Sequence, residues 1–216
     1  MTSLLTVSPS PHVRSGMTTQ KIMLLVVLAL VPAIVAATVV FGPRALFLVV
    51  FCAVISMFTE MVCQKLMQKE TTYTDGSAML TGVLLALNLP ATLPLWEAAI
   101  GCVFAIAVVK QLFGGLGCNF ANPAIVARIA LAMGFASRMA NYPHPANGID
   151  ALASATPLAV SGDLGAANYV TLLLGNHGGV LGETCAITIL IGGIYLIATK
   201  VISPVIPVTY LATVAV

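Results

Sequence analysis

One stretch of the chain combines a hydroxyl, a carboxylate and small side chains in an order that could support covalent attachment. Residues 150–158 read Asp-Ala-Leu-Ala-Ser-Ala-Thr-Pro-Leu, and Thr156 offers a secondary hydroxyl that can form a phosphodiester. The small residues before it leave room for a modifying enzyme, and Pro157 stiffens the stretch because its ring fixes φ. Residue type alone does not distinguish Thr156 from other loop threonines, so its surroundings must decide its role.

A second group of polar residues lies in or beside apolar segments. Arg128 interrupts an apolar run, where a charge is costly unless it is paired, so it is a candidate functional residue. A phosphate, a lipid headgroup, Glu60 or Glu183 could pair with it, and snorkelling toward an interface is the plain structural alternative. Asn119 and Asn122 could satisfy the backbone of a broken helix or contact a bound ligand.

The composition excludes several classes of protein. Of 216 residues, 59% are hydrophobic and 7% are charged, with a mean hydropathy of +1.05. Soluble domains carry about 25% charged residues, so the chain is expected to be embedded in a lipid bilayer. The net charge of +2 is too small to indicate a nucleic-acid partner, and the five cysteines include no Cys-x-x-Cys pair, so no metal site is expected.

The apolar runs predict an all-α polytopic membrane protein, a helical bundle with short or broken helices. A leader, 1–21, precedes a transmembrane domain, 22–216, with a long polar loop at 140–176. The expected helical segments are 22–41, 45–64, 77–89, 95–113, 124–139, 180–199 and one that opens at 204. The third and fifth are short and bordered by Gly or Pro, a pattern that points to ligand sites at membrane depth. Because the last residues are apolar, we also expect the chain to be the front part of a longer protein, truncated at its C-terminus.

The distribution of basic residues predicts the orientation. If the leader is cytoplasmic, that side receives Arg14, Lys21, Lys65, Lys69, Lys110 and Lys200, whereas the opposite side receives Arg44 and Arg138. Cytoplasmic loops carry the excess of Lys and Arg, so this orientation is favoured. It places the 140–176 loop, and Thr156 within it, outside the cytoplasm.

Several motifs in a fixed order resemble a known family. Residues 7–12 (Val-Ser-Pro-Ser-Pro-His), 75–90 (starting Asp-Gly-Ser-Ala-Met-Leu) and 113–124 (Phe-Gly-Gly-Leu-Gly-Cys-Asn-Phe-Ala-Asn-Pro-Ala) are similar to RnfD, a membrane component of the Rnf ion-translocating electron-transport complex. Residues 174–176 followed by 181–184 fit the same pattern. NqrB, a component of the sodium-pumping NADH:quinone reductase, is the more distant relative in this RnfD/NqrB family.

The resemblance implies an FMN joined through its phosphate to a threonine by a flavin transferase that works outside the cytoplasm. The target pattern is Asp, two variable residues, Ser or Thr, Gly, Ala, and the acceptor; Asp150, Ala155 and Thr156 match it. Ala153 and Ser154 depart from it, and Ser154 supplies a hydroxyl one position later. Asp150, Ser154, Asn119, Asn122 and Arg128 are the further candidates for contact with the cofactor, and a second, free flavin such as riboflavin is possible in relatives.

The resemblance also implies a urea-channel-like core of helical repeats in the cytoplasmic (inner) membrane of a bacterium or archaeon. The implied activity is electron relay within a complex that couples ferredoxin:NAD oxidoreduction to sodium or proton translocation. Its implied partners are a flavin-bearing extracytoplasmic subunit and iron–sulfur subunits in the membrane and cytoplasm. The chain would not act as an enzyme alone. The alternative function is a small-solute channel of the same fold without a redox cofactor.

Overall fold

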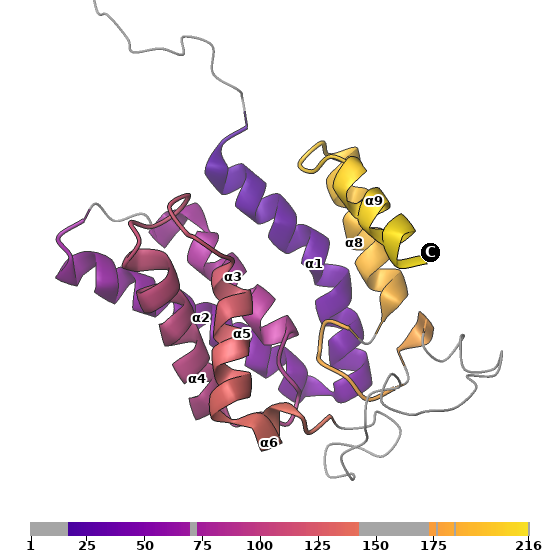
Figure 1. Cartoon of the computed structure of the whole chain (residues 1–216), viewed down its shortest axis with the longest axis horizontal. Helices are drawn as coiled ribbons and strands as arrows, with labels where there is room; N and C mark the ends of the chain where they lie inside the picture. Colours follow the sequence, from indigo (N-terminus) through magenta and orange to yellow (C-terminus); the bar gives the residue numbers. More distant parts are fainter. Residues whose placement is uncertain (1–16, 70–72, 143–172, 176, 184, 216) are drawn as a thin grey trace, which may run out of the picture.

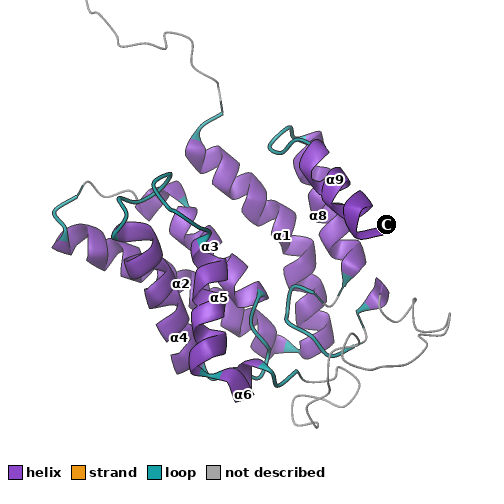
Figure 2. Ribbon diagram, viewed as in Figure 1, coloured by secondary structure: helices purple, strands orange, loops and turns teal. Residues whose placement is uncertain are grey.

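The chain forms a bundle of helices in which two long apolar helices organise several shorter ones (Figure 1). The structure is a computed structural model that describes residues 17–69, 73–142, 173–175, 177–183 and 185–215. Every element of these described residues is a helix, as the secondary-structure colouring in Figure 2 shows. The expectation of an all-helical polytopic membrane protein is therefore confirmed.

The first two helices form a hairpin around a tight turn. Helix α1 covers Thr19–Phe41 and α2 covers Pro43–Leu66, and both are long and apolar enough to cross a membrane. Gly42 joins them at φ 82°, a conformation that favours glycine, and Pro43 begins α2 where its missing N–H costs nothing. The sequence thus determines both the helices and the turn.

A short helix packs closely against α2. After the 3₁₀ turn η1 (Tyr73–Asp75), α3 runs from Ser77 to Leu87, too short to cross a bilayer as a full span. Gly82 allows close approach, because a Cβ at this position would lie 2.5 Å from the carbonyl oxygen of Cys52 on α2. The predicted short helix at 77–89 is confirmed, and its packing depends on a residue without a side chain.

The next helix changes its winding halfway along. Helix α4 (Leu95–Val103) continues directly into the π-helical segment η2 (Phe104–Gln111). Together they fill most of the predicted segment 95–113. A sequence pattern does not distinguish π from α winding, and π-helical turns occur frequently at functional sites.

Helix α5 (Pro123–Gly134) is shorter than the predicted segment 124–139. Phe135, at φ −128° and ψ 45°, leaves helical geometry, and a separate turn of helix, α6 (Ala136–Met139), follows. The expectation of one continuous helix is wrong at this point, since Gly134 at the end of α5 is a poor helix former.

The predicted span 180–199 is also wrong at its start, because α8 begins only at Ala186 and ends at Ala198. Residues 180–182 instead lie against the C-terminal end of α3. The backbone N–H of Leu181 donates to the carbonyl of Leu89 (3.2 Å), and that of Gly182 donates to Leu87 (2.7 Å). Terminal carbonyls of a helix need such donors when water is absent, so tertiary contacts replace the expected first turns of α8.

The outer surface is apolar, as expected of a chain in lipid. The last helix, α9 (Val205–Ala215), has no buried residue from Val205 to Val214, and Gly192 alone is buried on α8, where it meets the carbonyl of Ala29 on α1. Fully buried leucines gather instead between α2, α3 and α4, where Leu48, Leu85 and Leu93 belong to one core. This core surrounds the polar site described next.

Candidate functional site

A lysine and a glutamate form an ion pair inside the apolar bundle. Lys110, from the π-helical segment, places its Nζ atom 2.6 Å from Oε1 of Glu60 on α2. The two side chains are 2% and 1% exposed, so the pair is removed from solvent. Charges buried in this way require a partner, and those within transmembrane segments are usually functional.

Three further side chains connect this pair into a hydrogen-bonded chain. Nζ of Lys110 donates to Oγ of Ser77 (2.6 Å), and that hydroxyl donates to Oδ1 of Asp75 (2.7 Å). On the other side of the pair, Nε2 of Gln111 donates to Oε1 of Glu60 (2.8 Å). The result is a continuous polar path from Asp75 in η1 through Glu60 in α2 to Gln111. We call these five residues the Glu60–Lys110 cluster.

The cluster retains free acceptor capacity. Oε2 of Glu60 is buried and has no hydrogen-bond partner among the described residues, and the same is true of Oγ of Ser56, one helical turn earlier on α2. An unsatisfied buried oxygen is costly, so its presence calls for an explanation in terms of function or an unseen bound group. Residues four apart lie on the same face of a helix, which brings both oxygens to the interior side of α2.

A polar cavity lies beside the cluster at one end of the bundle. Its volume is about 540 Å³, and Asp75 and Gln111 line it together with Thr19, Gln20, Gln64, Lys69, Thr74, Gly114, Gly115 and Leu116. The cavity therefore borders both ends of the hydrogen-bonded chain, and an ion or water in it would meet Asp75 and Gln111 before Glu60.

A second ion pair stabilises the opposite end of the bundle. Arg138 on α6 donates to the buried carboxylate of Glu97 on α4, and its guanidinium lies 5.7 Å from the centre of the Trp96 ring. At this end Arg44 donates to the carbonyls of Thr92 and Leu93. The two arginines therefore mark the end at which the chain leaves α6.

The attachment residues predicted from the sequence lie outside the described part of the chain. Asp150, Ser154 and Thr156 follow Tyr142, the last described residue after α6. The structure thus gives the position from which this segment departs, next to the Glu97–Arg138 pair, and nothing about its own conformation.

The two asparagines lie at the other end of α5 from that departure point. The side chain of Asn122 accepts from the N–H of Ala124 (3.0 Å) and caps α5, which is a structural role. Oδ1 of Asn119 is buried without a partner among the described residues. Helix α5 has 12 residues, about 18 Å at 1.5 Å per residue, so the asparagines and Tyr142 are not brought together.

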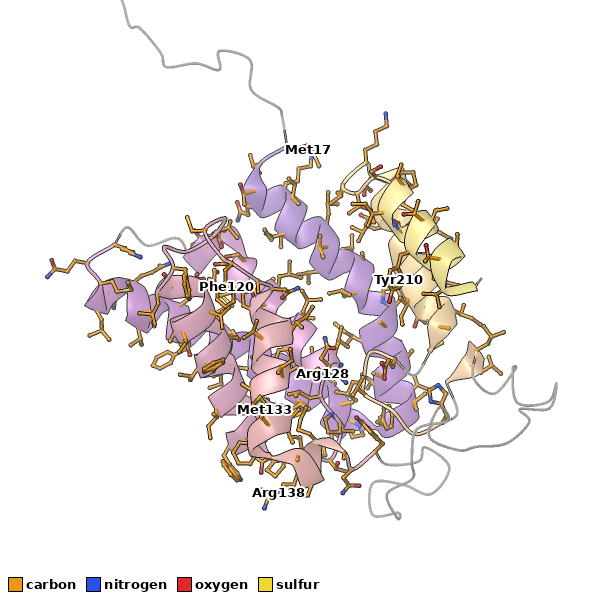
Figure 3. All side chains as sticks on the ribbon, viewed as in Figure 1. Met17, Phe120, Arg128, Met133, Arg138 and Tyr210 are labelled. Atoms are coloured by element: carbon orange, nitrogen blue, oxygen red, sulfur yellow. The ribbon has the colours of Figure 1, made fainter. Side chains whose placement is uncertain are left out.

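Arg128 lies between these two ends, on α5, as the labels of Phe120, Arg128 and Arg138 show (Figure 3). Of the partners considered from the sequence, Glu60 is paired with Lys110, and Glu183 lines a different cavity between α1, α3 and α8. Within the described part of the chain, Arg128 has neither an ion pair nor a hydrogen bond through its guanidinium.

Sequence reasoning missed the role of Lys110. It was grouped with the basic residues of one membrane surface, whereas the structure buries it among helices. Its position within the apolar run 95–113 was the available signal, because a lysine inside such a segment is expected to have a partner. Ser77 and Gln111 carried no comparable signal, since both residue types are common at helix ends.

Comparison with known proteins adds an independent finding. The family model described as "NQR2, RnfD, RnfE family" matches residues 6–216. The D subunit of the Na(+)-translocating ferredoxin:NAD(+) oxidoreductase complex of Acetobacterium woodii is 47% identical to this chain, covering 98% of the chain and 68% of that protein. The D subunit of the proton-translocating ferredoxin:NAD(+) oxidoreductase complex of Clostridium ljungdahlii is 39% identical, covering 99% of the chain and 68% of that protein. The chain spans about two thirds of the length of these relatives.

Proposed function

Because the chain belongs to the NQR2, RnfD, RnfE family, we propose that it is a membrane subunit of an ion-translocating ferredoxin:NAD oxidoreductase complex. The observation that carries this proposal is the 47% identity to the Acetobacterium woodii protein over 98% of the chain. The subunit does not turn over a substrate by itself. It relays electrons within the complex, beside the other membrane subunits, the extracytoplasmic subunit and the iron–sulfur subunits.

The electron carrier of this subunit is an FMN bound covalently through its phosphate to Thr156. The match of Asp150, Ala155 and Thr156 to the target of a flavin transferase supports this assignment. The bound flavin supplies one- and two-electron transfer, and protein contacts tune its potential. A covalent tether keeps such a carrier near its redox partners. The guanidinium of Arg128 fits an anionic cofactor, because it has no anionic partner among the described residues.

The orientation follows from the charges at the two ends of the bundle. Lys21 lies in the first turn of α1, and Lys65 and Lys69 lie at the end of α2, with Nζ of Lys69 donating to the carbonyl of Gln111. Figure 1 places the turn between α8 and α9, which carries Lys200, at the same end. We assign this end to the cytoplasm, because basic residues accumulate there. Tyr142 and the segment with Thr156 are then extracytoplasmic.

The Glu60–Lys110 cluster is the part of this chain that responds to the translocated cation. Its buried carboxylate, whose second oxygen has no partner among the described residues, lies near a polar cavity at the cytoplasmic end and offers an oxygen ligand to a cation. The names of the two relatives differ in the cation, which is Na(+) for the Acetobacterium woodii complex and a proton for the Clostridium ljungdahlii complex.

The second, free flavin belongs at the end of α5 opposite Tyr142. Asn119 offers there a buried amide oxygen without a partner in the described part of the chain, about one α5 length from the end at which the Thr156 segment departs. Asn119 is therefore assigned to this second flavin and Arg128 to the covalent FMN, whereas Asn122 caps α5.

The test of the proposed function is in-gel fluorescence of the complex purified from cells that express the flavin transferase. We expect a fluorescent band for this chain under denaturing conditions, and its loss in Thr156→Ala. Ser161→Ala is the matched control, since it removes a hydroxyl five residues beyond the acceptor and should leave the band. A dark wild-type band would refute covalent attachment and would favour a channel without a redox cofactor.

A further inference from the structure

A groove along α5 carries a positive charge that no described residue neutralises. It has a volume of about 340 Å³ and is lined by Ile125, Arg128, Ile129, Ala132, Ala136, Met139, Ala140 and Tyr142. The first four lie at helical spacing on one face of α5, and the others continue this face over α6 to the point where the chain leaves the described part. One guanidinium and one phenol are thus set in an otherwise apolar groove.

The guanidinium of Arg128 is available to an anion from outside the described helices. Arg128 is half-buried in a helix only 12 residues long and has no ion pair or hydrogen bond there. The carboxylates of Glu60 and Glu97 are held by Lys110 and Arg138, and that of Asp75 accepts from Ser77. A charged side chain at this depth is expensive unless an opposite charge reaches it.

We propose that Arg128 and Tyr142 form the binding site for the phosphate group of the flavin tethered at Thr156. This inference rests on the proposed function and deepens it by naming the residue that holds the phosphate. A guanidinium presents paired donors that match phosphate oxygens, and the phenol of Tyr142 adds a donor to the lining of the groove. The apolar walls suit the flat ring of the cofactor, and the volume lies in the range of small-molecule pockets.

The chain is long enough to make this contact. About 14 residues separate Tyr142 from Thr156, and an extended chain spans at most about 3.3–3.6 Å per residue. Arg128 lies six residues before the end of α5, about 9 Å along the helix axis. The tether can therefore bring the phosphate back to the depth of Arg128.

The test compares FMN with riboflavin, which lacks the phosphate. The complex carrying Thr156→Ala is titrated with each flavin, and binding is followed by quenching of flavin fluorescence. We expect FMN to bind about 10- to 100-fold more tightly than riboflavin, the range for a charge-assisted hydrogen bond to a buried cation. This preference should fall to about one in Thr156→Ala with Arg128→Gln.

Two variants keep the outcome interpretable. Arg128→Lys retains the charge and loses the paired donors, so it should keep part of the preference for FMN. Arg44→Gln removes a positive charge at the same end of the bundle, outside the groove, and should keep all of it. An equal preference for FMN in the Arg128→Gln and Arg44→Gln proteins would overturn the proposal.

A phospholipid is the other source of a phosphate at this depth. Native mass spectrometry of the Thr156→Ala complex tests this alternative by detecting any phospholipid that stays bound. A phospholipid that is retained in Thr156→Ala, lost in Arg128→Gln and not displaced by FMN would overturn the flavin assignment. A dark wild-type band in the gel would instead refute the attachment at Thr156, and the preference of the Thr156→Ala complex for FMN would still report on the groove.

Discussion

Replacing Lys110 by Met should destabilise the bundle strongly, because it leaves a carboxylate buried without its cation. Glu60 is 1% exposed and would keep only the hydrogen bond from Gln111 at 2.8 Å. Methionine is similar in length to lysine and fills nearly the same space, so little of the effect would come from a cavity. The change therefore isolates the electrostatic contribution of Lys110.

The expected loss in free energy of unfolding is about 3–5 kcal/mol, the cost of breaking a buried ion pair by removing one partner. The lost hydrogen bond to Ser77 lies within this range, at about 0.5–1.5 kcal/mol. A domain of ordinary stability has about 5–15 kcal/mol in total, so the effect should be easily measured.

The assay is equilibrium unfolding of the purified complex in mixed micelles, with a double-mutant cycle. Glu60→Gln combined with Lys110→Met removes both charges and should recover at least about 2 kcal/mol relative to the sum of the single variants. Lys65→Met, in the exposed last turn of α2, is the control and should change stability by less than about 0.5 kcal/mol. If Lys110→Met is as stable as Lys65→Met, or if the cycle shows no coupling, the reasoning is refuted.

Two further predictions concern packing and capping. Gly82→Ala should lower the free energy of unfolding by about 1–3 kcal/mol, because its Cβ would lie 2.5 Å from the carbonyl oxygen of Cys52. Gly193→Ala has open space around it and should be neutral or stabilising. Equal effects of the two substitutions on unfolding would contradict this account. Asn122→Ala should cost about 0.5–2 kcal/mol by removing the cap of α5, with Asn122→Ser retaining most of the stability. Hydrogen exchange at the Ala124 amide measures this loss, and unchanged protection would show that the cap is not needed.

Helix positions were predictable where hydrophobic runs and helix-ending residues agree. The predicted segments 22–41, 45–64 and 77–89 correspond to α1, α2 and α3 within a few residues. In each case Gly or Pro ends or begins an apolar run, and such residues act locally. The sequence was less informative at 180–199, because residues 180–182 exchange helical hydrogen bonds for contacts with α3 that are distant in the chain.

Some residues of the candidate site were likewise predictable from the sequence, and others were not. The attachment motif around Thr156 and the isolated charge of Arg128 can be read from the sequence, and the attachment at Thr156 stays a prediction. The groove beside Arg128 could not be predicted from the sequence, because it depends on the break at Phe135 that turns α6 and Tyr142 against α5. The urea-channel-like arrangement of repeats likewise stays a prediction.

By itself the sequence determined that the chain lies in a membrane, where α1, α2 and α3 lie along it, and which family its motifs resemble. These properties follow from composition, periodicity and local conformational preferences, which do not depend on distant contacts. The tertiary structure alone decided that Lys110 pairs with Glu60 and leaves Arg128 without a partner among the described residues. Fifty residues separate Glu60 from Lys110, and the pairing of charges so far apart is fixed by how the helices pack.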